Sequence, residues 1–309
     1  MIQVKNLTKR YGSLTALDHF DLDVQKGEIF GLLGPNGSGK TTAINCMLSL
    51  LKYSKGEIKL FGEPMRADNY EVKRRIGVVM QNVAVFNELT VYENIDYFCG
   101  LYVPEKAKRR MLVDESIDLT GLGEYRKFLP RKLSGGLLRR LNIACGIAHR
   151  PELIFLDEPT IAVDPQSRNH ILERIRELNS NGSTVVYTSH YMDEVEQLCT
   201  RIMIMDRGKS VAVGTKDELK AMIREGEKIT MELQDLPDSV FSEIKNIDGL
   251  FMAEYSGNRL TARCPSGGHH LISMLDILRH SDVDIGRVFT EPPTLNDVFL
   301  EITGKELKD

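Results

Sequence analysis

The residues best suited to chemistry form a glycine-rich run that ends in lysine and threonine, Gly34-Pro35-Asn36-Gly37-Ser38-Gly39-Lys40-Thr41. An apolar, strand-like run precedes it and a helix-like run follows it. Backbone N–H groups of such a loop bind phosphate at a helix N-terminus, and glycines allow both the close approach and the unusual backbone angles. Lys40 would meet the β- and γ-phosphates, and the Thr41 hydroxyl would supply an oxygen ligand for Mg²⁺. The spacing therefore predicts a nucleoside triphosphate site. The alternative, a chance glycine-rich turn, explains this strand–loop–helix context less well.

Two adjacent carboxylates, Asp157 and Glu158, directly follow the apolar run Leu153–Leu156. A strand that is apolar throughout is typical of one covered on both faces, and packing alone gives no reason for two acids at its end. Asp157 fits a Mg²⁺-binding role. Glu158 fits a base that polarises the water attacking the γ-phosphate. The alternative is a solvated strand end with no chemical role.

Between these two elements stands Leu133-Ser134-Gly135-Gly136, and with it the sequence resembles the ATP-binding cassette family, which has its signature motif at this place. The resemblance implies that Ser134, Gly135 and Gly136 bind nucleotide, and that Ser134 and Gly136 contact the γ-phosphate held by a second subunit. Taken alone, serine before two glycines is a simple helix N-cap. Leu137 departs from the family pattern, which usually has glutamine there and thus one more polar contact.

Further residues match the family position by position. Tyr11 resembles the aromatic residue that stacks on adenine, and Gln81 resembles the glutamine that reaches Mg²⁺ and links the site to a helical region. Asp164 occupies the place of the D-loop aspartate, with altered neighbours, and His190 resembles the switch histidine that contacts the γ-phosphate. Taken singly, Tyr11 and His190 would more often be structural. The resemblance covers residues 1 to about 220 and implies catalytic roles for Glu158, His190 and Gln81, metal ligands at Thr41, Gln81 and Asp157, and nucleotide contacts from Tyr11, the loop from Gly34 to Thr41 with the following Thr42, the signature residues and Asp164.

The C-terminal run Glu291-Pro292-Pro293-Thr294-Leu295-Asn296-Asp297-Val298-Phe299-Leu300-Glu301-Ile302-Thr303-Gly304 resembles the ending of cassettes of the daunorubicin-resistance type, which energise export of drugs, antibiotics and toxin-like peptides. The resemblance implies an ATP hydrolase that binds ATP and Mg²⁺ and drives export through a separate transmembrane permease subunit. It also implies a second ATP-binding subunit, as a homodimer, at the cytoplasmic face of the cell membrane.

Three alternatives remain open: the ATPase of an importer, a non-transport member acting on nucleic acid or the ribosome, and a regulatory subunit without turnover. Lys40 and Asp157 lie too close in the chain for the long coiled coil of repair ATPases, and the chain holds one cassette where translation-type members hold two. Both Glu158 and His190 are present, which disfavours a subunit without turnover. The ending alone favours export over import.

The elements that must position these residues follow from the apolar patterns. Residues 1–30 alternate short β-type runs with turns, and residues 86–150 are mainly helical in pattern. The buried-type strands Leu153–Leu156 and Thr184–Thr188 are each followed by a helix, which predicts a parallel sheet. We therefore expect an α/β fold: a P-loop ATPase core with an antiparallel β subdomain and a helical subdomain, plus a small α+β C-terminal domain.

A domain boundary is predicted near residues 220–228, giving a nucleotide-binding domain at 1–222 and an accessory domain at 226–309. The accessory domain shows the order β-α-β-β-α-β, which resembles a split βαβ module, followed by a last helix. Thr294 stands three residues before Asp297, the spacing of a capping box at that helix.

Composition limits the partners. The 309 residues contain 40 Lys and Arg against 44 Asp and Glu, a net charge of −4, so no overall basic character favours nucleic acid. No apolar run approaches the roughly 18 residues that span a bilayer, so we expect the membrane-spanning part on another chain. The cysteines lie far apart and without a CxxC pair, which predicts packed, reduced thiols of a cytosolic protein.

Overall fold

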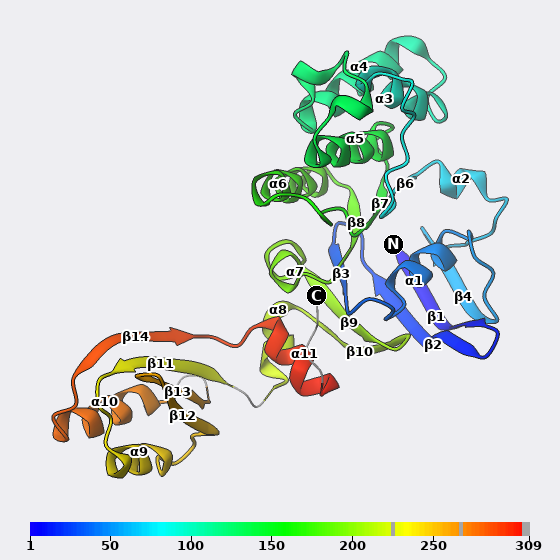
Figure 1. Cartoon of the computed structure of the whole chain (residues 1–309). Coiled ribbons are helices and arrows are strands. Elements are labelled where there is room, and N and C mark those ends of the chain that lie inside the picture. Colours follow the sequence, from blue (N-terminus) through cyan, green and yellow to red (C-terminus); the bar gives the residue numbers. More distant parts are fainter. Residues whose placement is uncertain (224–225, 266–267, 305–309) are drawn as a thin grey trace. The chain divides into compact units, whose positions relative to one another are not determined.

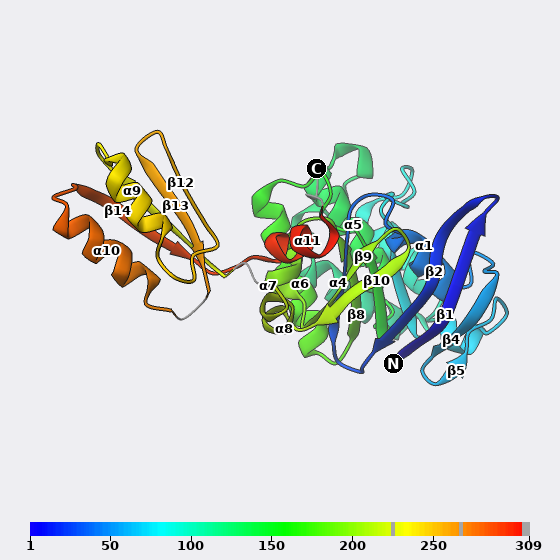
Figure 2. The same ribbon diagram turned by 90° about the horizontal axis from the view of Figure 1, so that it is seen from below.

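The structure is a computed structural model that describes residues 1–223, 226–265 and 268–304. It divides into two compact units, described separately below: the first runs from Met1 to Lys216 and the second begins at Asp217 (Figures 1 and 2). The division into 1–222 and 226–309 made from the sequence stays a prediction. Residues 224–225 of that boundary, and residues 305–309 at the end of the predicted accessory domain, lie outside the described residues.

The first unit is built on a six-stranded sheet with the order β10-β9-β3-β8-β7-β6. Five of these strands run parallel, and β10 runs antiparallel to β9. Every residue of β3, β7 and β8 is buried, which agrees with the apolar runs Ile29–Leu33 and Leu153–Leu156. The strands are β3 (Ile29–Leu33), β6 (Ile76–Val79), β7 (Leu153–Asp157), β8 (Thr184–Ser189), β9 (Arg201–Asp206) and β10 (Lys209–Gly214).

Parallel strands place the loops that follow them at one edge of the sheet, where ligands bind in open α/β folds. The glycine-rich run follows β3, the two acids lie at the end of β7, and His190 follows β8. Residues 40–47 form the helix α1 (Lys40–Met47) immediately after the glycine-rich run. The predicted strand–loop–helix order is thus confirmed.

A second, antiparallel sheet has the order β2-β1-β4-β5, as the alternation of residues 1–30 predicted. Its strands are β1 (Ile2–Tyr11), β2 (Leu14–Val24), β4 (Lys55–Leu60) and β5 (Glu63–Pro64). Side chains of this sheet share one hydrophobic core with α1 and with strands of the six-stranded sheet. The glycine-rich run therefore connects β3 to α1, and both of these elements contribute side chains to that core.

The predicted helical subdomain is confirmed as a group of helices with a core of its own, seen together in Figure 1. Its helices are α3 (Val91–Gly100), α4 (Lys106–Leu119) and α5 (Gly135–Ile147), with short 3₁₀ turns at Gly123–Tyr125 and Pro130–Lys132. A capping box between Thr90 and Glu93 fixes the start of α3. The remaining helices of the first unit are α2 (Tyr70–Lys73), α6 (Pro165–Ser180) and α7 (Met192–Leu198), while α8 (Lys216–Ala221) begins at the division between the units.

The second unit contains an antiparallel sheet with the order β12-β13-β11-β14, and Figure 2 shows α9 and α10 on the same side of it. The predicted order β-α-β-β-α-β is confirmed, and its sheet order is that of a split βαβ module. The elements are β11 (Glu227–Leu233), α9 (Asp238–Lys245), β12 (Met252–Ser256), β13 (Arg259–Cys264), α10 (His270–His280), β14 (Ile285–Glu291) and α11 (Leu295–Thr303). The predicted capping box between Thr294 and Asp297 is present at α11.

Two expectations drawn from composition bear on the environment of the chain. The cysteines Cys46, Cys99, Cys145, Cys199 and Cys264 are free thiols, and all are buried, as predicted. Of the helices in the described ranges, none combines the length and the apolar character needed to cross a membrane.

His149 joins the helical subdomain to the six-stranded sheet. Its ring stacks on Tyr102 with 3.9 Å between ring centroids, and its Nε2 lies 3.0 Å from the carbonyl oxygen of Ile76 at the start of β6. Among the described residues its Nδ1 has no hydrogen-bond partner. Burial of the ring lowers the pKa of His149 to about 4, so the imidazole is neutral at pH 7 with its proton on Nε2.

This buried imidazole predicts acid sensitivity. Because its pKa is about 4 in the folded chain and about 6.5 in an unfolded one, the unfolded state binds the extra proton and stability falls as the pH drops from 6.5 towards 4. The loss reaches about 3 kcal/mol at the lower end. Replacing His149 with Gln should remove about one proton from the pH slope of the unfolding free energy, measured by urea titration. The exposed His19, replaced with Asn, serves as control; an unchanged slope in His149→Gln would contradict the assignment.

Candidate active site

The glycine-rich loop has a backbone that only glycine adopts easily at two points. Gly37 has a φ of 81° and Gly39 a φ of 108°. Gly34 is required for a different reason, because a Cβ there would lie 2.4 Å from the carbonyl oxygen of Met205. Asn36 is exposed and Pro35 is half-buried, while Ser38 is buried. The backbone of the loop is therefore tightly curved, and its N–H groups are available for phosphate at the start of α1.

Lys40 is buried inside this loop. Its Nζ donates hydrogen bonds to the carbonyl oxygens of Gly34, at 2.7 Å, and Pro35, at 3.2 Å, and lies 3.3 Å from Oε1 of Glu158. Burial lowers the pKa of Lys40, and the charge of Glu158 acts in the opposite direction. The ammonium group is thus held where the loop and the acid at the end of β7 meet.

Asp157 is fully buried and its two oxygens are each fixed by a hydroxyl group. Thr41 Oγ1 donates to Oδ2 at 2.8 Å, and Thr188 Oγ1 donates to Oδ1 at 2.6 Å. Thr188, at the end of β8, also accepts a hydrogen bond from the backbone N–H of Glu158 at 2.9 Å. Thr188 was not predicted; its signal in the sequence is a lone threonine just before the Ser189-His190 pair.

Glu158 lies between two basic side chains, those of Lys40 and His190. Its Oε1 faces Lys40, and its Oε2 lies 3.2 Å from Nδ1 of His190. The side chain is only 7% exposed. Its backbone has a φ of 47°, a left-handed conformation that costs a non-glycine residue on the order of 1–3 kcal/mol. The structure therefore brings together the predicted Lys40, Glu158 and His190.

Arg139, in α5, ties the predicted Gln81 to this site through the backbone. One guanidinium nitrogen donates to the carbonyl oxygens of Met80 and Gln81, and the other donates to the carbonyl oxygen of Glu158 at 2.6 Å. Burial lowers the pKa of Arg139, opposed by the charges of Asp157 and Glu158. The Gln81 side chain itself is exposed. Arg139 was not predicted, although an arginine on the buried face of a helix is a signal that could have identified it.

Among the signature residues, Gly136 lies beside the D-loop aspartate Asp164. Ser134 caps α5 by accepting a hydrogen bond from the N–H of Leu137 at 3.3 Å, and Asp164 caps α6 by accepting one from the N–H of Ser167. Gly136 packs against α6, since a Cβ there would lie 2.5 Å from Ser167 Oγ. Ser134 and Gly135 are exposed, and no hydrogen bond in the described part of the chain joins Ser134 to the glycine-rich loop.

Tyr11 and Thr42 complete the predicted set. Tyr11 ends β1 with 45% of its surface exposed, and the ammonium of Lys9 lies 4.5 Å from the centroid of its ring. The ring of Tyr11 is thus held near a cation and is exposed enough to stack on a flat ligand. Thr42 is half-buried in the first turn of α1.

These residues fit a magnesium nucleotide. Ser38 Oγ is buried and has no hydrogen-bond partner among the described residues, so a donor is available inside the loop. Thr41 and Asp157 offer adjacent hard oxygens, the ligand type that Mg²⁺ prefers. Loop amides and Lys40 suit phosphate.

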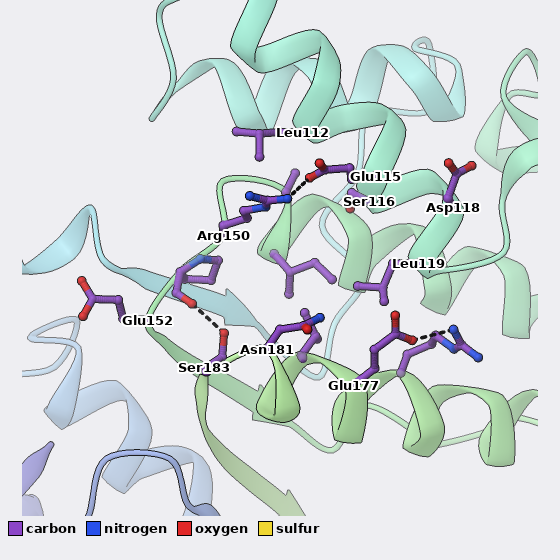
Figure 3. A pocket seen from close by; sticks show the side chains of 16 residues that line it. Leu112, Glu115, Ser116, Asp118, Leu119, Arg150, Glu152, Glu177, Asn181 and Ser183 are labelled. Atoms are coloured by element: carbon purple, nitrogen blue, oxygen red, sulfur yellow. Dashed lines mark hydrogen bonds and ion pairs between the residues drawn. The ribbon is translucent and has the colours of Figure 1, made fainter.

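A cavity of about 810 Å³ lies elsewhere, between the ends of α4 and α6 and the start of β7 (Figure 3). Its charged side chains are largely engaged with one another, as in the Arg150–Glu115 and Arg174–Glu177 pairs. None of the residues predicted for nucleotide binding lines it, so its size does not make it the candidate site.

Comparison with known proteins places these features in a family. The family model described as ABC transporter matches residues 17–161. The linearmycin resistance ATP-binding protein LnrL of Bacillus subtilis (strain 168) is 35% identical over the whole of both chains. The daunorubicin resistance ATP-binding protein DrrA3 of Streptomyces coeruleorubidus is 33% identical over 99% of this chain and 96% of its own. The predicted resemblance to daunorubicin-resistance cassettes is thereby confirmed.

Among solved structures, the chain is similar to a dimeric, post-hydrolysis state of the ATP-binding cassette MJ0796 bound to ADP and Pi. The TM-score is 0.64 with 28% sequence identity, and the match covers 70% of this chain and 98% of that one. The predicted fold class is confirmed by this likeness.

The position of Lys40 predicts a loss of nucleotide affinity in Lys40→Met. A hydrogen bond to a charged group contributes about 1.5–3 kcal/mol, so the dissociation constant for ATP should rise roughly 10- to 100-fold. Titration with a fluorescent ATP analogue measures it. Lys52→Met is the matched control, because Lys52 is an exposed lysine outside the site. Equal affinities for the two variants would refute the assignment of the loop.

Proposed function

The chain belongs to the ABC transporter family, and we propose that it is the ATP-hydrolysing subunit of an exporter, working through a separate permease subunit. The observation that carries this proposal is the buried Glu158 carboxylate, held between Lys40 and His190 beside the Thr41–Asp157 pair. A site that only binds nucleotide has no need for a carboxylate in that position. The resistance proteins LnrL and DrrA3, similar along almost their whole length, support export as the direction.

Binding rests on residues from four segments. We propose that the loop from Gly34 to Thr42 and Lys40 hold the phosphates of ATP, and that Tyr11 stacks on its adenine. Thr41, Asp157 and Gln81 would hold Mg²⁺, which when bound neutralises charge on the β- and γ-phosphates. The orientation of Asp157 is set in advance by the two hydroxyl groups on its oxygens, so little reorganisation is needed.

The chemistry is assigned to Glu158 and His190. Transfer of the γ-phosphoryl group to water depends on positioning and on charge stabilisation. Glu158 would accept a hydrogen bond from the attacking water and orient it, while Lys40 and His190 stabilise charge on the transferred group. Before the reaction, the contact between His190 and Glu158 would hold the Glu158 carboxylate in position.

Completion of the site is assigned to a second copy of the chain. Ser134 and Gly135 are exposed, and the adjacent Gly136 lies beside Asp164. A two-fold homodimer places the signature of each copy over the nucleotide of the other and closes two equivalent sites. ATP then favours the closed dimer, and hydrolysis removes that preference, which is the free energy available to the permease. The dimeric MJ0796 cassette supports this arrangement.

In this proposal the permease carries out transport, and part of the chain must contact it. We place the chain at the cytoplasmic face of the membrane, with the helical subdomain and Gln81 against the permease. Arg139 supports that choice, since it joins the carbonyl of Gln81 to that of Glu158. The cargo class that the resemblance implies is a drug, an antibiotic or a peptide toxin.

Glu158→Gln should separate binding from turnover. The amide keeps the size of the side chain but is a far weaker base, so the ATPase rate should fall by roughly 10²- to 10⁴-fold while ATP affinity is retained. Phosphate release by the full chain measures the rate. The control is Glu152→Gln, which changes an acid just before the same strand, at the end away from the site, and should leave the rate unchanged. Normal turnover in Glu158→Gln would show that another group acts as the base.

Dimer closure gives a second test. With Mg²⁺ and ATP, the slow Glu158→Gln variant should shift from monomer to dimer in sedimentation velocity, because trapped nucleotide bridges the two copies. Adding Ser134→Arg should abolish the shift, because the long side chain would clash sterically in the closed interface, while nucleotide affinity of the monomer is kept. A dimer that persists with Ser134→Arg would contradict the proposed interface.

A further inference from the structure

Glu194, in α7, is a buried acid that takes no direct part in the proposed chemistry. Its Oε2 accepts hydrogen bonds from three hydroxyl groups: Thr160 and Tyr187 at 2.7 Å and Ser189 at 3.1 Å. Its side chain is 3% exposed. Burial, reinforced by the charge of Glu194, raises the pKa of Tyr187 well above its usual range, which keeps that phenol a donor. A buried carboxylate is costly unless it is paired, so its second oxygen matters.

That second oxygen faces Arg168 of α6. Arg168 Nε lies 3.1 Å from Oε1 of Glu194, and the guanidinium lies 4.8 Å from the centroid of the Tyr191 ring. Arg168 therefore contacts the residue that anchors Ser189 and also the residue after His190. The Tyr191 backbone N–H in turn donates to Ser189 Oγ at 2.9 Å.

The two neighbours of His190 are thus both held in place: Ser189 by Glu194, and Tyr191 by Arg168. The rings of His190 and Tyr191 lie 4.1 Å apart, and His190 Nδ1 lies 3.2 Å from the Glu158 carboxylate. We propose that the Arg168–Glu194 ion pair positions the segment Ser189–Tyr191 and thereby holds His190 against Glu158. The inference rests on the proposed function; within it, Arg168 and Glu194 are positioning residues that act through His190.

Arg168 also lies close to the D-loop aspartate. Arg168 lies one helical turn after Asp164, whose carbonyl oxygen accepts the Arg168 N–H at 2.9 Å. The start of α6 therefore contacts the signature through Gly136 and the switch segment through Arg168.

A simpler explanation is that Arg168 only fastens α6 to α7. Arg176, two turns further along α6, already does this at the other end, where it donates to the carbonyl oxygen of Gln197 at 3.1 Å. The two arginines join the same pair of helices, but only Arg168 touches the neighbours of His190. Arg176→Ala is therefore the matched control.

The kinetic test compares Arg168→Ala, Arg168→Lys, Glu194→Gln and Arg176→Ala in the full chain. We expect kcat to fall at least about tenfold in Arg168→Ala and Glu194→Gln with KM for ATP nearly unchanged, because misplacing a catalytic group affects the chemical step. Arg168→Lys keeps the charge but not the planar contact with Tyr191, so it should recover part of the loss. Arg176→Ala should keep wild-type kcat; a similar fall there would overturn the proposal.

A double-mutant cycle separates positioning from a merely structural role. If Arg168 acts through His190, then adding Arg168→Ala to His190→Ala should lower the single-turnover rate no further. Additive losses would overturn the inference. If the wild-type chain hydrolyses ATP and Arg168→Ala matches it, the inference alone fails; if the wild-type chain shows no hydrolysis, the proposed function fails.

A spectroscopic measurement keeps the inference testable even then. The ring ¹⁵N signals of His190, assigned with His190→Gln, should shift in Arg168→Ala and stay in place in Arg176→Ala, without any turnover. An unchanged His190 signal in folded Arg168→Ala would overturn the positioning role.

Discussion

The contact on which the site depends is that of one buried carboxylate with two basic groups, Glu158 between Lys40 and His190. Charges in a protein interior interact more strongly than in water, but they must be held in place to do so. The strand order β3-β8-β7 holds them in place, because it sets the ends of three strands side by side. Asp157 pairs in register with Thr188, and Leu33 with Ser189. The buried strands therefore hold in place the polar side chains that stand at their ends.

Local patterns accounted for much of the site. The glycine-rich run shows its strand–loop–helix context within a few residues, and the two acids follow directly from a fully apolar strand. The element order of the second unit could also be predicted, since β12 and β13 alternate and the turn between them contains Gly257 and Asn258. In each case the physical cause lies within one or two elements that are adjacent in the chain.

What the sequence alone did not reveal depends on neighbours that are distant in the chain. Thr188 binds Asp157 only because β8 lies beside β7, and the sheet order is not written in any local pattern. Arg139 acts on carbonyl oxygens, and a backbone acceptor has no residue type to detect. The Arg168–Glu194 pair joins two helices whose facing sides emerge only after packing. Such residues look like ordinary helix or strand positions until the tertiary structure is known.

The position of Arg139 has a mechanical consequence. A single buried cation fastens the helix that begins just after Ser134 to two backbone carbonyl oxygens, those of Gln81 and Glu158. The helical subdomain and the backbone of Glu158 are therefore linked at this point, and the subdomain cannot move without displacing the carbonyl of Glu158 or breaking that hydrogen bond. A displacement of the helical subdomain would therefore also displace the backbone at Glu158.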